Sequence, residues 1–275
     1  MFRQMALGLA AGLPTGLKSK IHNSKSLDNL TRRVYGMALG SKPIEIQEGP
    51  MKGIRFAASK HVSHAHIGGS YEQELVDAID RYLKPGMVCY DIGASIGYLT
   101  MQMAQRAKRV YAFEPSPEAR GELAKHTAAN GFTNIEVVSS PLTDKITEVT
   151  FAVTNTAYGS GIDWNGSQEG RWPTIKLMST TLDLFTKDHP MPDLLKMDIE
   201  GEEGSAMEGG RQMLMQKKPI IFCELHGLQP ALATCKVLTE CGYTVRHMDG
   251  TPFDPRLEGQ IVPGMLQVIA LPSNA

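Results

Sequence analysis

The sequence predicts an α/β fold in which a central, mostly parallel sheet carries helices on both faces. From Tyr71 onward, short apolar runs alternate with segments of helical periodicity, a pattern typical of right-handed strand–helix–strand units. The composition agrees with a globular protein, since 42% of the 275 residues are hydrophobic and 21% are charged. A chain of this length can bury a substantial core without disulfides or metals.

Two parts of the chain are predicted, an extension over residues 1–70 and the α/β domain over residues 71–275. Residues 43–59 alternate in polarity around Gly49 and Gly53, which predicts a β-hairpin. The hairpin is expected to be an appendage on the N-terminal side of the domain.

Residues 1–42 are small, polar and in places basic, which favours one or two helices. Their apolar stretch, Met5–Leu13, is shorter than the roughly 20 residues that cross a bilayer, so no membrane span is expected. A short amphipathic helix is favoured there over a signal peptide. Cys89 and Cys223 lie in apolar runs and predict buried thiols in a reducing compartment, which favours a cytoplasmic protein.

The α/β domain is expected to begin with a helix after Tyr71 that ends before Pro85. Apolar runs then predict seven strands, over residues 87–92, 109–113, 134–139, 193–199, 219–225, 243–247 and 266–270. Helical periodicity predicts helices over residues 97–106, 117–129, 203–215 and 229–241. The helix over 117–129 has the clearest boundaries, because Ser116 is a good N-cap and Gly131 follows its end.

Residues 141–190 interrupt this alternation and predict an inserted β-hairpin. The β-rich stretches 146–153 and 173–179 flank a loop rich in glycine and aromatic residues. Long loops are unusual in compact domains unless they serve a site. The loop is therefore a candidate lid over a substrate, with Tyr158 and Trp164 as substrate contacts. A purely structural hairpin is an equal alternative.

The charge balance argues against a nucleic-acid partner. The chain has 28 Lys and Arg residues against 29 Asp and Glu residues, and no basic stripe is available to neutralise phosphates. The histidines at 61, 64 and 66 match no zinc spacing and predict a polar turn rather than a metal site. Self-association into a homo-oligomer stays open.

A Gly-rich turn is the main site motif. Asp91 ends a predicted strand, and Gly93, Ser95 and Gly97 lead into a helix whose N-terminal N–H groups are unpaired. The spacing lacks the G-x-G-x-x-G of dinucleotide sites and the Lys of phosphate-binding loops. It suits a ligand with an amino-acid end and a nucleoside end.

Glu114 supplies the second half of this motif. It ends the next strand, 23 residues after Asp91, where an acid accepts hydrogen bonds from both hydroxyls of a ribose. The order and spacing of the two parts are more specific than either part alone.

Four stretches of the chain resemble the FkbM family of S-adenosylmethionine-dependent methyltransferases. They are DIGASIGYLT from Asp91, RVYAFEPSPEA from Arg109, LLKMDIEGEEGSAMEGGRQML from Leu194 and IIFCELH from Ile220. The resemblance implies a class I methyltransferase Rossmann-like fold and S-adenosylmethionine as the cofactor. It also implies methylation of a hydroxyl on a sugar, a glycan or another small natural product. Ser95 departs from the pattern, since Asn is usual there.

The expected cofactor-binding residues come from both halves of the motif, from the start of the first helix and from two later strand ends. They are Tyr71, Glu72, Asp91, Gly93, Ser95, Gly97, Glu114, Pro115, Ser140 and Asp198.

An acidic cluster is expected at the carboxyl ends of the strands over 193–199 and 219–225, which are predicted neighbours. Asp198 would hold the cofactor ammonium or the acceptor hydroxyl, with Glu224 beside it. His226, with an ordinary pKa near 6.5, would take the acceptor's proton, and Glu200 would contact the substrate. We favour this base over a divalent metal held by the same acids. A structural alternative makes Glu200 a helix cap and His226 a hydrogen-bonded residue at the sheet edge.

The functional alternatives are N-methylation of a small molecule or peptide and a non-catalytic binding protein on the same fold. The intact Gly turn and Glu114 argue against the second of these.

Overall fold

A computed structural model describes residues 43–57, 59, 61–154, 160–163, 166, 170–257 and 266–273. The expectations for residues 1–42 and for the side chains of Tyr158 and Trp164 concern residues outside these ranges.

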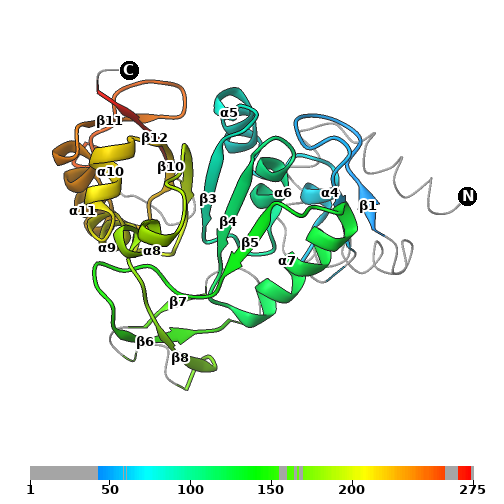
Figure 1. Cartoon of the computed structure of the whole chain (residues 1–275), viewed down its shortest axis with the longest axis horizontal. Coiled ribbons are helices and arrows are strands. Elements are labelled where there is room, and N and C mark those ends of the chain that lie inside the picture. The colour runs from blue at the N-terminus through cyan, green and yellow to red at the C-terminus, as the bar shows by residue number, and fades with distance from the viewer. Residues whose placement is uncertain are drawn as a thin grey trace, which may run out of the picture.

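The centre of the molecule is a seven-stranded sheet with the order β11-β12-β10-β9-β3-β4-β5 (Figure 1). Its strands are β3 (Val88–Ile92), β4 (Arg109–Phe113), β5 (Ile135–Val138), β9 (Leu194–Met197), β10 (Ile220–Glu224), β11 (Tyr243–His247) and β12 (Gln267–Pro272). β12 pairs antiparallel with β10 and β11, and the other neighbours are parallel. The mostly parallel sheet predicted from the sequence is therefore confirmed.

β3 and β9 lie side by side in the middle of this sheet, and the chain leaves them toward opposite edges. From β3 the chain continues to β4 and β5, whereas from β9 it continues to β10. The loops after β3 and β9 therefore diverge at the carboxyl ends of their strands. Such a crevice is where ligands bind in open α/β sheets.

Helices cover both faces of the sheet (Figure 1). On one face lie α5 (Gln73–Tyr82), α6 (Tyr98–Ala104) and α7 (Pro117–Asn130), and on the other lie α8 (Leu182–Asp188), α9 (Glu203–Glu208), α10 (Arg211–Lys217) and α11 (Leu228–Glu240). Because successive strand residues point to opposite faces, the strands split the core in two. Cys89 and Val110 pack under the first set of helices, while Tyr90 and Tyr111 pack under the second.

The predicted N-terminal hairpin is present as β1 (Ile44–Glu45) paired with β2 (Arg55–Phe56). Phe56 is fully buried, with its ring centroid 5.3 Å from that of Tyr98. The next element, α4 (His64–Ile67), corrects the prediction of a polar turn. His61 and His66 are 4% and 1% exposed, and the His66 ring stacks on Tyr71 with centroids 4.0 Å apart. The segment therefore packs against the core.

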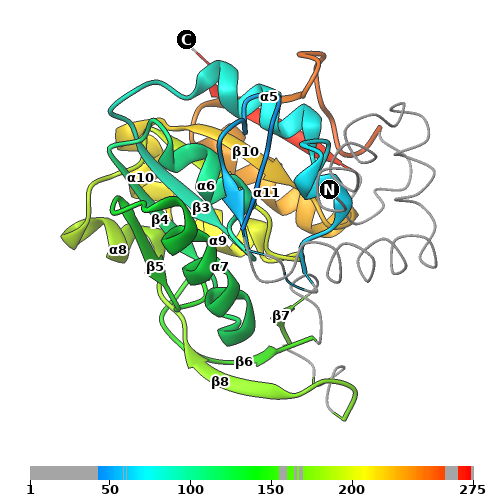
Figure 2. The ribbon, with the colours of Figure 1, turned by 90° about the vertical axis from the view of Figure 1, so that its right-hand side faces the viewer.

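The inserted hairpin is also confirmed. β6 (Glu148–Ala152) pairs antiparallel with β8 (Thr174–Met178) and with β7 (Gly161–Ile162). This small sheet lies at the opposite end of the molecule from α5 (Figure 2). A Cβ added to Gly161 would lie 3.5 Å from the Cβ of Glu200, so β7 reaches the crevice of the main sheet.

The structure corrects two helix predictions. The single helix expected over 203–215 is broken into α9 and α10 at Gly209 and Gly210. A Cβ on Gly209 would lie 2.2 Å from the carbonyl oxygen of Thr143, so the chain passes too close there for a regular helix side chain. The short helix α8, capped by Thr181, was not predicted because its seven residues carry little periodicity.

Within the described residues, every helix is too short or too polar to cross a bilayer. The four cysteines are free thiols, and Cys89 and Cys223 are buried as expected.

Candidate active site

The Gly-rich turn after β3 is shaped by contacts that exclude side chains. Gly93 has φ 77°, and a Cβ there would lie 1.8 Å from the carbonyl oxygen of Asp198. Gly97 has φ 87° and packs against Leu123, 2.9 Å from where its Cβ would stand. Ser95 is also left-handed, with φ 50°. Gly93 thus lets the loops after β3 and β9 touch, and Gly97 lets α6 approach α7.

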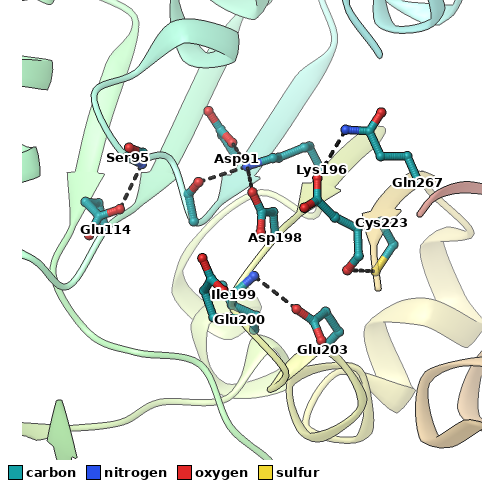
Figure 3. A network of polar contacts seen from close by, with 12 residues as sticks. Asp91, Ser95, Glu114, Lys196, Asp198, Ile199, Glu200, Glu203, Cys223 and Gln267 are labelled. Carbon is teal, nitrogen blue, oxygen red and sulfur yellow. Dashed lines mark hydrogen bonds and ion pairs between the residues drawn. The ribbon is translucent and has the colours of Figure 1, made fainter. Parts of the chain in front are cut away.

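Glu114 at the end of β4 holds the turn in place. Its two carboxylate oxygens accept hydrogen bonds from the backbone N–H groups of Ser95 and Ser116, both at 2.8 Å. Figure 3 shows the bond from Ser95. The side chain is only 6% exposed. Burial raises its pKa to about 7, against these hydrogen bonds and the charges of Lys196 and Arg120, which lower it.

A cavity opens between this turn and the loop after β9. Six of the predicted cofactor residues line it: Gly93, Ser95, Glu114, Pro115, Ser140 and Asp198. Glu200, predicted to contact substrate, lies on the same wall. The insert closes another side through Phe151, Ser160 and Ile162. The structure thus brings the insert to the predicted cofactor residues, which the sequence did not indicate.

A second cavity lies on the other side of the Gly turn. The predicted residues that line it are Tyr71, Glu72, Asp91, Gly93, Ser95 and Asp198, and Lys196, His66 and Tyr98 also contribute. Gly97 lines neither cavity, and its role is the packing described above. Burial raises the pKa of Glu72 to about 7, although the nearby charge of Lys196 lowers it.

Lys196 lies on β9 and lines the second cavity. Its Nζ donates to the carbonyl oxygen of Gly93 at 2.8 Å and lies 3.6 Å from Asp91 and 3.8 Å from Asp198 (Figure 3). Burial lowers the pKa of Lys196, but the charges of Asp91 and Asp198 outweigh burial and raise it. The side chain is therefore a cation that neutralises part of the acidic site.

Asp91 is fully buried and accepts a hydrogen bond from Thr100 Oγ1 at 2.5 Å through Oδ2. Its Oδ1 makes no hydrogen bond among the described residues. This oxygen instead faces Lys196 Nζ at 3.6 Å, so it keeps the capacity to accept a hydrogen bond beside the second cavity.

The predicted acidic cluster is present. His226 Nε2 lies 3.5 Å from Asp198 Oδ1, 3.5 Å from Glu224 Oε1 and 3.7 Å from Glu200 Oε2. Its Nδ1 lies 2.9 Å from Oε1 of Glu203. The four predicted residues thus come together from the ends of β9 and β10.

The protonation of this cluster differs from the sequence expectation. Burial lowers the pKa of His226, but hydrogen bonds with Glu203 and Glu224 and the charge of Asp198 raise it to about 10. Burial raises the pKa of Asp198 to about 6, against the charge of Lys196. The ordinary pKa of His226 does not hold in this cluster, because Glu203, which was not expected there, adds a buried carboxylate on Nδ1.

Three residues of the site were given no individual role from the sequence, although Lys196 and Glu203 lie in the stretch from Leu194 that resembles the family. Glu203 anchors His226, Lys196 donates to the carbonyl oxygen of Gly93, and Gln267 on β12 donates to Glu224 Oε2 at 3.1 Å. Lys196 carries a sequence signal, since a Lys inside an apolar strand needs carboxylate partners. Gln267 carries none, because only the antiparallel pairing of β12 brings it to Glu224.

A wider groove adjoins the cluster on the β11 and β12 side. It is lined by Glu72, Gln73, Glu74, His247, Met248, Asp249, Thr251, Leu266 and Gln267. Glu72 lines both this groove and the second cavity.

Comparison with known proteins identifies relatives for most of this region. Residues 91–245, more than half of the chain, match the family model described as the methyltransferase FkbM domain. The chain is 37% identical over 77 residues to an uncharacterised protein of Methanocaldococcus jannaschii, a match that covers 27% of this chain and 30% of that protein.

Two solved structures are similar in fold. The methyltransferase FkbM from Methylobacillus flagellatus has 19% identity and a TM-score of 0.44, over 68% of this chain and 43% of that chain. The precorrin-6y C5,15-methyltransferase from Geobacter metallireducens has 16% identity and a TM-score of 0.46, over 78% of this chain and 93% of that chain. The matches thus span less than half of the Methanocaldococcus and Methylobacillus proteins.

Proposed function

The chain belongs to the FkbM methyltransferase family, and on that premise we propose that it transfers a methyl group from S-adenosylmethionine to a hydroxyl of a small molecule or glycan. The observation that carries the proposal is the shared cavity of the Gly93 turn, Glu114 and Asp198. One wall offers a buried carboxylate and the other an acidic cluster. When bound, the cofactor supplies an electrophilic methyl group on a cationic sulfur.

The residues present fit this cofactor. Glu114 keeps lone pairs beyond the two that it gives to the backbone, so it can accept hydrogen bonds from a ribose diol. Asp91 carries a buried oxygen that makes no hydrogen bond and lies 3.6 Å from Lys196 Nζ, so it can still accept a hydrogen bond from an ammonium group. The N–H groups at the start of α6 suit a carboxylate. Tyr71, Glu72 and Ser140 would complete the contacts from the cavity walls.

The acidic cluster supports a role in holding the acceptor. Asp198 lines both cavities, and Glu224 and His226 lie beside it. Carboxylates that accept a hydrogen bond from a hydroxyl both orient its oxygen and draw away its proton. Fixing the acceptor in line with the methyl group contributes roughly 7 to 11 kcal/mol of barrier lowering in favourable cases. We assign Asp198 and Glu224 to this task, His226 to holding these two carboxylates in place, and Glu200 to the rim of the acceptor site.

The test begins with binding. Isothermal titration should give one S-adenosylmethionine per chain, and Glu114→Ala should weaken it by roughly 1 to 3 kcal/mol, the cost of charge-assisted hydrogen bonds. Unchanged affinity in Glu114→Ala contradicts the ribose assignment. No binding by the wild type contradicts the function as a whole.

The acceptor is then sought with methyl-labelled cofactor and small-molecule and glycan extracts, followed by mass spectrometry. Label on oxygen supports the proposal, and label on nitrogen replaces it with N-methylation. Cofactor binding without transfer to any acceptor in the extracts favours a binding protein on this fold.

A further inference from the structure

The acidic cluster has the donor set of a metal site. One oxygen each of Asp198 and Glu224 and one ring nitrogen of His226 lie within 4.8 Å of one another. An ion that holds its ligands at roughly 2.0 to 2.2 Å separates opposite ligand atoms by about 4.2 Å, so shifts of a few tenths of an ångström would close the shell. Asp198 and Glu224 are partly exposed, with 28% and 13% of their side chains accessible, so an ion can reach them.

Each of these residues uses its other polar side-chain atom to contact a different group outside the cluster. His226 uses Nδ1 for Glu203, Glu224 uses Oε2 for Gln267, and Asp198 uses Oδ2 for Lys196. The remaining atoms, His226 Nε2, Glu224 Oε1 and Asp198 Oδ1, face one another. The two contacts of His226 Nε2 are both 3.5 Å long, at the upper limit for a hydrogen bond. Three ligand atoms thus converge on one point, and an ion bound there would displace the proton that Nε2 carries.

Glu203 is the observation that distinguishes this arrangement from an ordinary acidic surface. It is fully buried, and its Oε1 accepts from the N–H groups of Ile199 and Gly201, both at 3.1 Å. Figure 3 shows the bond from Ile199. The same oxygen faces Nδ1 of His226, whose side chain is only 6% exposed. A buried carboxylate on one ring nitrogen, with the other nitrogen aimed at carboxylates, is the outer arrangement found around metal-bound histidines.

We propose that Asp198, Glu224 and His226 bind one divalent cation of the Mn²⁺ type. The two carboxylates favour hard cations such as Mg²⁺ and Mn²⁺, and the imidazole shifts the preference toward Mn²⁺. Glu200, with Oε2 3.7 Å from Nε2, is close enough to add a ligand. From the sequence we favoured a base without metal, and the mutual orientation of the four side chains reverses that preference.

The position of the ion gives it a chemical role. This step rests on the proposed methyl transfer. Asp198 lines the cavities on both sides of the Gly turn, so a cation held by its carboxylate can bind the acceptor oxygen and stabilise its deprotonated form. The proton would then leave to a neighbouring carboxylate or to solvent.

The test measures metal binding by itself. Mn²⁺ titrated into the chelator-treated full chain, followed by electron paramagnetic resonance, should show one site, and Mg²⁺ should compete more weakly. His226→Gln and Glu224→Gln should each weaken Mn²⁺ at least tenfold, since even groups behind the ligands are worth about 10- to 100-fold in affinity. The matched control is Glu148→Gln, which makes the same change at an exposed residue of the insert and should leave the affinity unchanged.

Folding and function are separated in the same samples. Circular dichroism shows whether each variant folds, and titration with S-adenosylmethionine reports the cofactor site without metal. A folded wild type with no saturable Mn²⁺ binding up to about 1 mM, an affinity near −4 kcal/mol, overturns the metal site. Loss of binding in Glu148→Gln as great as in His226→Gln overturns it as well. Mn²⁺ binding without cofactor binding supports the metal site and contradicts the proposed function.

Discussion

The two walls of the site are built in different ways. The wall around the Gly93 turn comes from short contiguous segments, and its geometry is set by backbone groups that hydrogen-bond to Glu114. The wall around Asp198 comes from the ends of β9 and β10 and from β12, and it is set by side chains that hold one another. The first wall depends on local conformation, and the second depends on tertiary contacts.

The two walls meet where Gly93 touches Asp198. The missing side chain lets the loops approach, and Lys196 joins them by donating to Gly93 while facing Asp198. A change at this junction should therefore damage both walls, whereas changes on either side should damage one.

The largest effect is expected from Gly93→Ala. Its Cβ would stand 1.8 Å from the carbonyl oxygen of Asp198, and its backbone has φ 77°. The clash forces the loops apart, so we expect a loss of at least about 3 kcal/mol in the free energy of unfolding, measured in urea. Binding of S-adenosylmethionine and of Mn²⁺ should be lost together.

The control is Gly86→Ala, which measures the cost of a side chain at positive φ without a steric clash. Gly86 has φ 85°, but nothing lies within 4 Å of its added Cβ. It should cost only about 1 kcal/mol, the usual penalty for a side chain in this conformation. Equal losses in the two variants contradict the role of the loop contact.

The next effect concerns the backbone-built wall and its pH dependence. Burial raises the pKa of Glu114 to about 7, and a ribose diol binds the ionised form. The free protein must therefore lose a proton to bind below pH 7, so the affinity for S-adenosylmethionine should rise with pH and level off above about 7, by up to tenfold per pH unit.

Glu114→Gln removes this titration. The difference in affinity between wild type and variant, measured by calorimetry from pH 5 to 8, should grow as pH rises through about 7. A constant difference across this range assigns the titration to another group. Mn²⁺ affinity should be unchanged, since Glu114 lies on the other wall.

The sequence predicts the first wall better than the second for the same physical reason. Asp91, Gly93 and Glu114 are recognised by their spacing and by their positions at or after the ends of predicted strands, and both can be read from the sequence. The pKa of His226 depends on hydrogen bonds with Glu203 and Glu224. The carboxylate of Glu224 is in turn positioned by a hydrogen bond from Gln267. Those contacts exist only after β10 pairs with β9 and β12.

The broken helix at Gly209 shows the same limit. Helical periodicity continues through residues 203–215, but the adjacent Gly209 and Gly210 weaken the helix, and the carbonyl oxygen of Thr143 occupies the space that a side chain on Gly209 would need. The contact joins segments far apart in sequence, so periodicity alone cannot reveal it. Seven strands and their mostly parallel order, by contrast, follow from alternation along the chain.

A smaller effect is expected from a variant in the wall around Asp198, which should weaken Mn²⁺ binding without changing cofactor binding. Glu203→Gln keeps an oxygen for His226 Nδ1 and for the two backbone N–H groups, but removes the negative charge. We expect Mn²⁺ affinity to fall about tenfold, with S-adenosylmethionine affinity unchanged. Equal weakening of both ligands contradicts the separation of the walls, and a lowered thermal midpoint identifies a folding defect.

The smallest effect is expected at the insert, because its sequence does not show to which wall of the site it belongs. Ile162 on β7 lines the cavity with Glu114 and pairs with Phe151. Its truncation in Ile162→Ala removes apolar contact from a half-buried position, so S-adenosylmethionine affinity should fall by about 1 kcal/mol, roughly fivefold. The matched control, Ile146→Ala, makes the same change at a residue of the insert that is 58% exposed and does not line the cavity, and it should have no effect.

If Ile162→Ala instead raises KM for the acceptor while leaving cofactor affinity intact, the insert belongs to the acceptor wall, as the lid hypothesis predicts. Equal effects of both variants on affinity would assign the insert a purely structural role.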